Sequence, residues 1–179
     1  MAAGAELIYF FRILCSVEKA YDRIKAVLYA KEWAFKRNPK YYNFDAIGGD
    51  CTNFISQCLY AGCGVMNYSR NAGWYYVSLS NRAPAWTSVE LLHDFLISNQ
   101  KAGPYAVELP LSYAKPGDII QLSFDGITYG HSLLVVSVGQ IPSEDNILIA
   151  THTDDSYNRA LSSYFYYSCR LLHIEGNHI

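Results

Sequence analysis

The residue best placed for chemistry in this sequence is Cys51, in the segment GGDCTNF at 48–54. The two glycines predict a tight turn, and Asp50 is a favourable N-cap for a helix that begins directly after it. Free backbone N–H groups and the helix dipole at such a position favour a thiolate, and the N–H of the cysteine itself can bind an oxyanion. Cys51 is therefore a candidate nucleophile, with a structural cysteine as the alternative.

A nucleophilic thiol needs a base, and His131 is the candidate. It opens the apolar segment 131–138, which has the pattern of a buried strand. A histidine at the mouth of a strand is held rigidly by the sheet and is suited to general-base catalysis. The plainer interpretation is a structural histidine at a sheet edge.

A third polar group usually orients such a base. In the predicted strand 147–154, alternation places Leu148, Ala150, His152 and Asp154 on one face. A hairpin turning over 139–146 would bring His131 opposite His152 or Asp154, since paired residues share a face. The residues leave these two candidates open.

Helices precede strands in the predicted order of elements. Apolar spacing and capping signals predict helices over 16–36, from Asp50 to Gly62, and from the capping box at 87–90 to Gly103-Pro104. Alternating and apolar runs predict four strands, at 118–124, 131–138, 147–154 and 164–174. Helices followed by strands without alternation indicate an α+β fold with an antiparallel sheet.

One domain is expected over 16–179, preceded by an apolar helical extension at 1–15 that lacks the features of a signal peptide. The five cysteines are odd in number, and Cys51 and Cys58 would lie about 10 Å apart along one helix, too far to bridge. Free thiols are therefore expected.

Composition excludes several classes of binding partner. A net charge of −2 and a pI of about 6.2 argue against nucleic acid, and no apolar run is long enough to span a bilayer. Cys51, His131, His152 and Asp154 have atoms suited to zinc but lack the spacing of a metal site, so neither a metal nor another cofactor is expected. The oligomeric state is left open.

Several motifs, taken together, resemble a known family. GDCTNF at 49–54, KPGDII at 115–120 and HSL at 131–133 are similar to the landmarks of NlpC-type and CHAP-type papain-like cysteine peptidases. Four more motifs extend the resemblance to the putative amidase domain family of bacterial proteins, over roughly residues 20–175. They are RNP at 37–39, GWYY at 73–76, PAW at 84–86 and HTDDS at 152–156.

The resemblance implies a papain-like fold and hydrolysis of an amide, in peptidoglycan or its stem peptides. It also implies a location outside the cell or in its envelope, with the cytoplasm as the alternative because no signal peptide is evident. Cys51 would be the nucleophile and His131 the base. His152 would be the orienting group, with Asp154 as its rival. Asn43, Tyr41 or Tyr42 would approach as the second oxyanion donor.

Two aromatic segments allow two interpretations. Trp74 and Trp86, with their neighbours, would line a wall on which a sugar or peptide stacks, or would anchor a long surface excursion at 63–86 to the core. The alternative function is accordingly a non-catalytic module that binds cell wall or glycan on the same fold.

Overall fold

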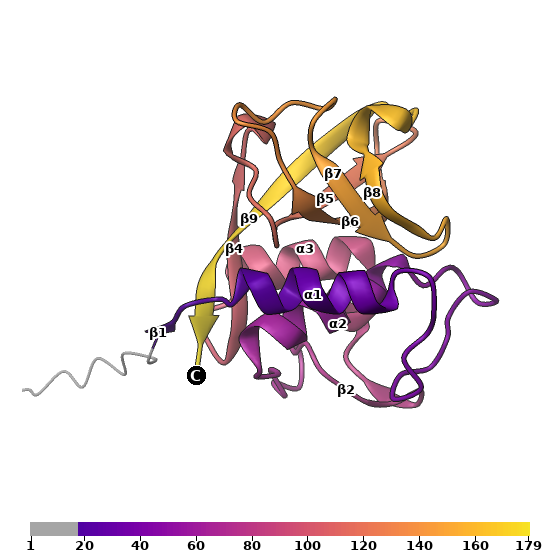
Figure 1. Ribbon diagram of the computed structural model, residues 1–179. Helices are drawn as coiled ribbons and strands as arrows, with labels where there is room; N and C mark the ends of the chain where they lie inside the picture. The colour runs from indigo at the N-terminus through magenta and orange to yellow at the C-terminus, as the bar shows by residue number, and fades with distance from the viewer. Residues whose placement is uncertain (1–17) are drawn as a thin grey trace, which may run out of the picture.

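The computed structural model describes residues 18–179, so the extension predicted for 1–15 lies outside the described residues. A largely antiparallel sheet carries three α-helices on one face (Figure 1). The elements in chain order are β1 (Glu18–Lys19), α1 (Arg23–Trp33), α2 (Cys51–Cys63), β2 (Tyr76–Ser78), β3 (Asn81–Arg82), η1 (Pro84–Trp86), α3 (Val89–Ser98), β4 (Gly103–Leu109), η2 (Leu111–Tyr113), β5 (Ile119–Ser123), β6 (Tyr129–Ser137), β7 (Leu148–Thr151), β8 (Ser156–Ala160), η3 (Leu161–Ser163) and β9 (Ser168–His178).

The main sheet has the order β1-β9-β5-β6-β7-β8, and β4 also pairs with β9. All of these strand pairs are antiparallel. The mixed α and β architecture agrees with the α+β prediction. The sequence pattern does not predict β4 and β8, because Gly103-Pro104 has the character of a helix stop and β8 (SYNRA) has no apolar alternation.

Helix α1 differs from its prediction at both its start and its buried face. It begins at Arg23 because the Asp22 side chain accepts the Lys25 N–H as a cap. The helical spacing of Ile24 and Leu28 predicts a buried face, but these residues are 72% and 57% exposed. The buried side is a stripe of alanines led by Ala26, whose small side chains permit close packing against α2.

Helices α2 and α3 lie close to their predicted positions. Helix α2 ends at Gly64, which adopts the left-handed conformation typical of a C-cap. Ser88 caps α3 through its side chain, but Glu90 does not complete the capping box. Its carboxylate instead accepts the Tyr129 N–H and pairs with Arg170, tying α3 to the sheet.

The segment 63–86 is anchored to the core through its tryptophans. Trp74 and Trp86 are both fully buried, and their indole N–H groups donate to Ser56 and Asn53 of α2. The predicted substrate wall at these two residues is therefore wrong. A large aromatic with a satisfied N–H gains more from burial than from exposure, so these rings build the core.

The register of β6 and β7 assigns residues to the two faces of the sheet. Leu134 pairs with Ala150, and Val135 pairs with Ile149. Leu134 and Ala150 pack in the core beneath the helices, whereas Val135 and Ile149 belong to a second cluster on the opposite face. This parity decides where the histidines of β6 and of the segment after β7 point.

Candidate active site

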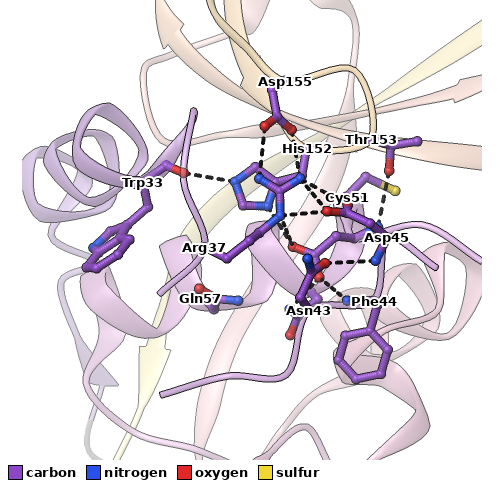
Figure 2. A network of polar contacts seen from close by, with 12 residues as sticks. Trp33, Arg37, Asn43, Phe44, Asp45, Cys51, Gln57, His152, Thr153 and Asp155 are labelled. Carbon is purple, nitrogen blue, oxygen red and sulfur yellow. Dashed lines mark hydrogen bonds and ion pairs between the residues drawn. The ribbon is translucent and has the colours of Figure 1, made fainter. Parts of the chain in front are cut away.

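Cys51 is the first residue of α2 and is 7% exposed. The predicted turn before it is present, with Gly48 and Gly49 at φ values of +99° and +97°. A Cβ on Gly49 would lie 2.9 Å from the Thr153 hydroxyl, which accepts the N–H of Asp50 (Figure 2). Glycine is required at 49 because of both the conformation and this close approach.

Asp50 precedes α2, but its carboxylate makes no capping hydrogen bond with the helix. Oδ1 accepts the Phe44 N–H and the Asn53 side-chain amide, at 2.9 and 2.8 Å. Oδ2 lies 2.6 Å from His152 Nδ1 and 3.5 Å from Arg37 Nε. The expected side-chain cap is therefore wrong, and the first N–H groups of α2 stay available for an anion.

His152 is 1% exposed and lies on the helix side of the sheet. Its ring stacks on Phe54 with a centroid distance of 3.9 Å. Nδ1 contacts Asp50, and Nε2 donates to the carbonyl oxygen of Trp33 at 2.9 Å (Figure 2). Both ring nitrogens are thus engaged away from His131, because the register turns this residue to the other face of the sheet.

Arg37 completes the network around Asp50. Its guanidinium forms paired hydrogen bonds with Asp45 and with Asp155, between 2.9 and 3.1 Å long. Burial opposes its charge, but the bonds to Asp155 and Asp45 raise its pKa above the ordinary value. The network ties the loop before Cys51 to the turn after β7 (Figure 2).

His131 is the third residue of β6 and is 7% exposed. Burial lowers its pKa to about 4; nearby Asp154 opposes this shift and Arg159 adds to it. The imidazole is therefore neutral at pH 7. Its Nε2 lies 3.5 Å from the Thr151 hydroxyl, and Nδ1 has no hydrogen-bond partner among residues 18–179.

The segments that carry Cys51 and His131 are in contact. The hydroxyls of Thr52 and Ser132, the residues that follow each of them, lie 3.2 Å apart. The Cys51 sulfur contacts Thr52 Oγ1 at 3.7 Å, and no hydrogen bond between the thiol and the imidazole is present in the described part of the chain. Hydrogen bonds between catalytic groups are often long or poorly aligned in substrate-free structures.

The remaining predicted site residues are placed as follows. Asp154 has a 70% exposed side chain that pairs with Arg159, and it makes no hydrogen bond to His131 in the described structure. The Tyr42 N–H donates to the Tyr76 hydroxyl, so it is not free to bind an oxyanion. The Asn43 side chain accepts the Asp45 N–H through its oxygen, and within residues 18–179 its amide NH₂ has no partner.

An aromatic cleft adjoins His131. The rings of Phe124 and Tyr164 lie 6.5 and 5.9 Å from the imidazole. Both line a cleft of about 570 Å³ together with Glu144 and the segment 165–167. Phe165 is 98% exposed there. Sequence reasoning placed the aromatic wall at Trp74 and Trp86 and missed this one, although the run YFYY at 164–167 was a visible signal.

Residues 18–179 contain no group of three or more His, Cys, Asp or Glu side chains arranged to hold a metal ion. No helix among them combines the length and the apolar character that a membrane span requires.

The fold and the site define an α+β domain with a cysteine at the open N-terminus of a helix, packed beside a strand that carries a buried histidine. The chain belongs to the family described as "Putative amidase domain", whose model matches residues 20–174. Membership in an amidase family indicates an amide hydrolase.

One curated relative and the solved structures complete the comparison. "Uncharacterized protein YhbB" of Bacillus subtilis (strain 168) is 39% identical over an alignment of 145 residues, which covers 78% of this chain and 43% of that protein. The chain therefore spans less than half the length of that relative. No solved structure gives a significant match.

Proposed function

We propose that the protein is a cysteine-dependent amide hydrolase of the papain-like type, with Cys51 as nucleophile and His131 as base. The observation that carries the proposal is the start of α2, where a slightly exposed thiol lies at a helix end that no side chain caps. The Thr52–Ser132 contact holds this helix end against the strand that presents His131.

Each step has a group to perform it. In the proposed reaction neutral His131 takes the thiol proton when substrate binding brings the two groups together, and the thiolate attacks the amide carbonyl. The first N–H groups of α2 bind the oxyanion, with the Asn43 amide as second donor. The imidazolium then protonates the leaving amine, and neutral His131 activates the water that hydrolyses the thioester.

Peptidoglycan or its stem peptides are the proposed substrate. The resemblance of the motifs to cell-wall hydrolases supports this class, and such a substrate would place the protein outside the cytoplasm. The cleft at 164–167 supports a substrate with extended apolar surface, because exposed aromatic rings beside a catalytic base offer a contact area for it.

The first test is thiol labelling. Burial raises the pKa of Cys58 well above its ordinary value and that of Cys63 to about 11, so both should react slowly. Iodoacetamide near pH 7 should therefore modify Cys51 selectively, faster than free cysteine, and His131→Ala should abolish the excess rate. Cys169→Ala, which removes a half-buried thiol, is the matched control.

The second test is digestion of purified peptidoglycan with wild type, Cys51→Ala and Cys169→Ala, with mass spectrometry of the released fragments. Wild type and Cys169→Ala should release the same fragments and Cys51→Ala none; the new termini would distinguish muramoyl-amide cleavage from peptide cleavage. Labelling of Cys51 no faster than free cysteine, with no release, would overturn the proposal in favour of a non-catalytic wall-binding module.

A further inference from the structure

We propose that Thr151 is the positioning residue for His131, holding the proton on Nε2 of the imidazole and leaving Nδ1 as the basic nitrogen. This inference rests on the proposed function for the role of His131, and it names a residue that the sequence motifs did not single out.

Thr151 is the last residue of β7 and is fully buried. Its hydroxyl oxygen lies 3.5 Å from His131 Nε2. The same oxygen lies 2.9 Å from the carbonyl oxygen of Ser132 and 3.0 Å from that of His152. One hydroxyl on β7 thus contacts both the imidazole and the backbone of β6 that carries it.

The number of protons fixes the direction of these contacts. A threonine hydroxyl has one hydrogen and two acceptor lone pairs, and a backbone carbonyl can only accept. The hydroxyl hydrogen of Thr151 is therefore used by the carbonyl of Ser132 or His152, and a lone pair faces His131. The carbonyl oxygens at 2.9 and 3.0 Å are nearer to the hydroxyl than Nε2 is at 3.5 Å, so the remaining contact is favourable when Nε2 donates, and the inferred tautomer has its hydrogen on Nε2.

The other nitrogen then has the property that catalysis needs. Because burial keeps His131 neutral at pH 7, one ring nitrogen carries a hydrogen and the other is basic. With the hydrogen on Nε2, Nδ1 is the basic nitrogen, and within residues 18–179 it has no hydrogen-bond partner. It is the nitrogen available to accept the thiol proton.

The two orienting groups considered from sequence are engaged elsewhere. His152 uses both nitrogens on Asp50 and Trp33, and Asp154 pairs with Arg159 at the surface. The Thr151 hydroxyl also bonds the backbone of Ser132, whose side chain touches Thr52 beside the nucleophile. Thr151 therefore links the imidazole to the frame that holds Cys51.

The test uses nuclear magnetic resonance of the full chain with ¹⁵N-labelled histidine, assigning His131 by its loss in His131→Ala. At pH 7 the wild type should show the hydrogen on Nε2. Thr151→Val, which keeps the shape and removes the hydroxyl, should shift the ring toward a mixture of tautomers, and Thr151→Ser should restore the wild-type signal.

Kinetics supply the second readout. Thr151→Val should lower kcat about tenfold, equivalent to about 1.4 kcal/mol, with KM little changed, and Thr151→Ser should recover most of the loss. A hydrogen on Nδ1 in the wild type, or an unchanged Nε2 tautomer in a folded Thr151→Val, would overturn the proposal. The wild-type spectrum decides the matter even where the valine variant does not fold.

The two proposals fail differently. If His131 carries its hydrogen on Nε2 but Cys51→Ala leaves hydrolysis intact, the tautomer assignment stands and the proposed function is wrong. If hydrolysis requires Cys51 and His131 but the hydrogen is on Nδ1, the proposed function stands and the role of Thr151 is wrong.

Discussion

Two buried histidines, His131 and His152, differ in what their ring nitrogens do. His152 uses both nitrogens, on Asp50 and on the Trp33 carbonyl, and stacks on Phe54. His131 has one long contact with Thr151 and a pKa that burial lowers to about 4. Both ring nitrogens of His152 have partners, whereas Nδ1 of His131 has none within residues 18–179.

The difference shows why burial alone does not mark a catalytic histidine. A buried polar group with every partner in place rigidifies its surroundings, whereas one left underbonded costs stability and persists where chemistry uses it. By this criterion His131 is the better candidate for the proposed base, and the His152 network holds the loop before Cys51. A finding that the reaction depends on His152 and the stability on His131 would contradict this comparison.

The largest effect is expected for His131→Ala. Removing a general base should lower the rate of Cys51-dependent hydrolysis by about 10²- to 10⁴-fold, while the midpoint of urea unfolding stays near that of wild type. Rates on the digestion substrate and urea curves measure both. His93→Ala, at a histidine of α3 that pairs with Asp94 and Glu108, is the control, and a similar loss in that variant would show that the effect is not specific to the site.

The largest stability effect is expected for His152→Ala. Asp50 and His152 are each 1% exposed, so removing one partner leaves a buried carboxylate short of a donor and should cost about 3–5 kcal/mol of unfolding free energy. Urea unfolding measures it. In Asp50→Asn the same substitution should cost much less, because the pair is already broken. If His152→Ala with Asp50 in place lost less than about 1 kcal/mol of unfolding free energy, the structural role of the pair would be contradicted.

The sequence predicted the local structure around the two proposed catalytic residues better than the contacts that support them. The helix start at Cys51 and the presence of a strand at His131 follow from local signals, since turns and apolar runs act over a few residues, although β6 begins two residues earlier than predicted, at Tyr129. The side of the sheet taken by His152 does not. Pairing depends on a register shift between Val135 and Ser137, and a change of one residue moves a side chain to the other face.

No local sequence pattern predicts the contacts that hold the loop before Cys51. Arg37 meets Asp155 across 118 residues of chain. The motifs that contain Arg37 and Asp155 belong to the family resemblance. The contact between these two residues, however, depends on the packing of α1 against the turn after β7. Trp74 and Trp86 illustrate the same limit, because aromatic content alone does not tell a core ring from a binding surface.

The pH dependence of stability sharpens the comparison further. The folded-state pKa of His131 is about 4, below the unfolded value near 6.5, so the unfolded chain binds the proton first. His131 therefore makes no difference above pH 6.5 and destabilises the fold as the pH falls from 6.5 toward 4. Between pH 7.5 and 4.5 the wild type should lose about 2–3 kcal/mol more than His131→Gln in urea unfolding.

The same titration should appear in catalysis. Because only the neutral imidazole accepts the thiol proton, the acid limb of kcat/KM should fall near pH 4 rather than near 6.5. An acid limb near 6.5, or equal acid losses of stability in wild type and His131→Gln, would show that His131 is solvated and would remove the contrast with His152.

The smallest effect tests the outer part of the His152 network. Arg37→Lys keeps the charge but loses the planar fork that binds Asp45 and Asp155 in pairs, on side chains that are 22–41% exposed. The free energy of unfolding, measured with urea, should fall by about 1 kcal/mol. The rate of Cys51 labelling should fall by less than it does in His131→Ala. Arg70→Lys, at an exposed position, is the matched control and should change neither quantity. If Arg37→Lys slowed labelling as strongly as His131→Ala without destabilising the chain, the network would act on the reaction itself, and the division between a reactive and a supporting histidine would not hold.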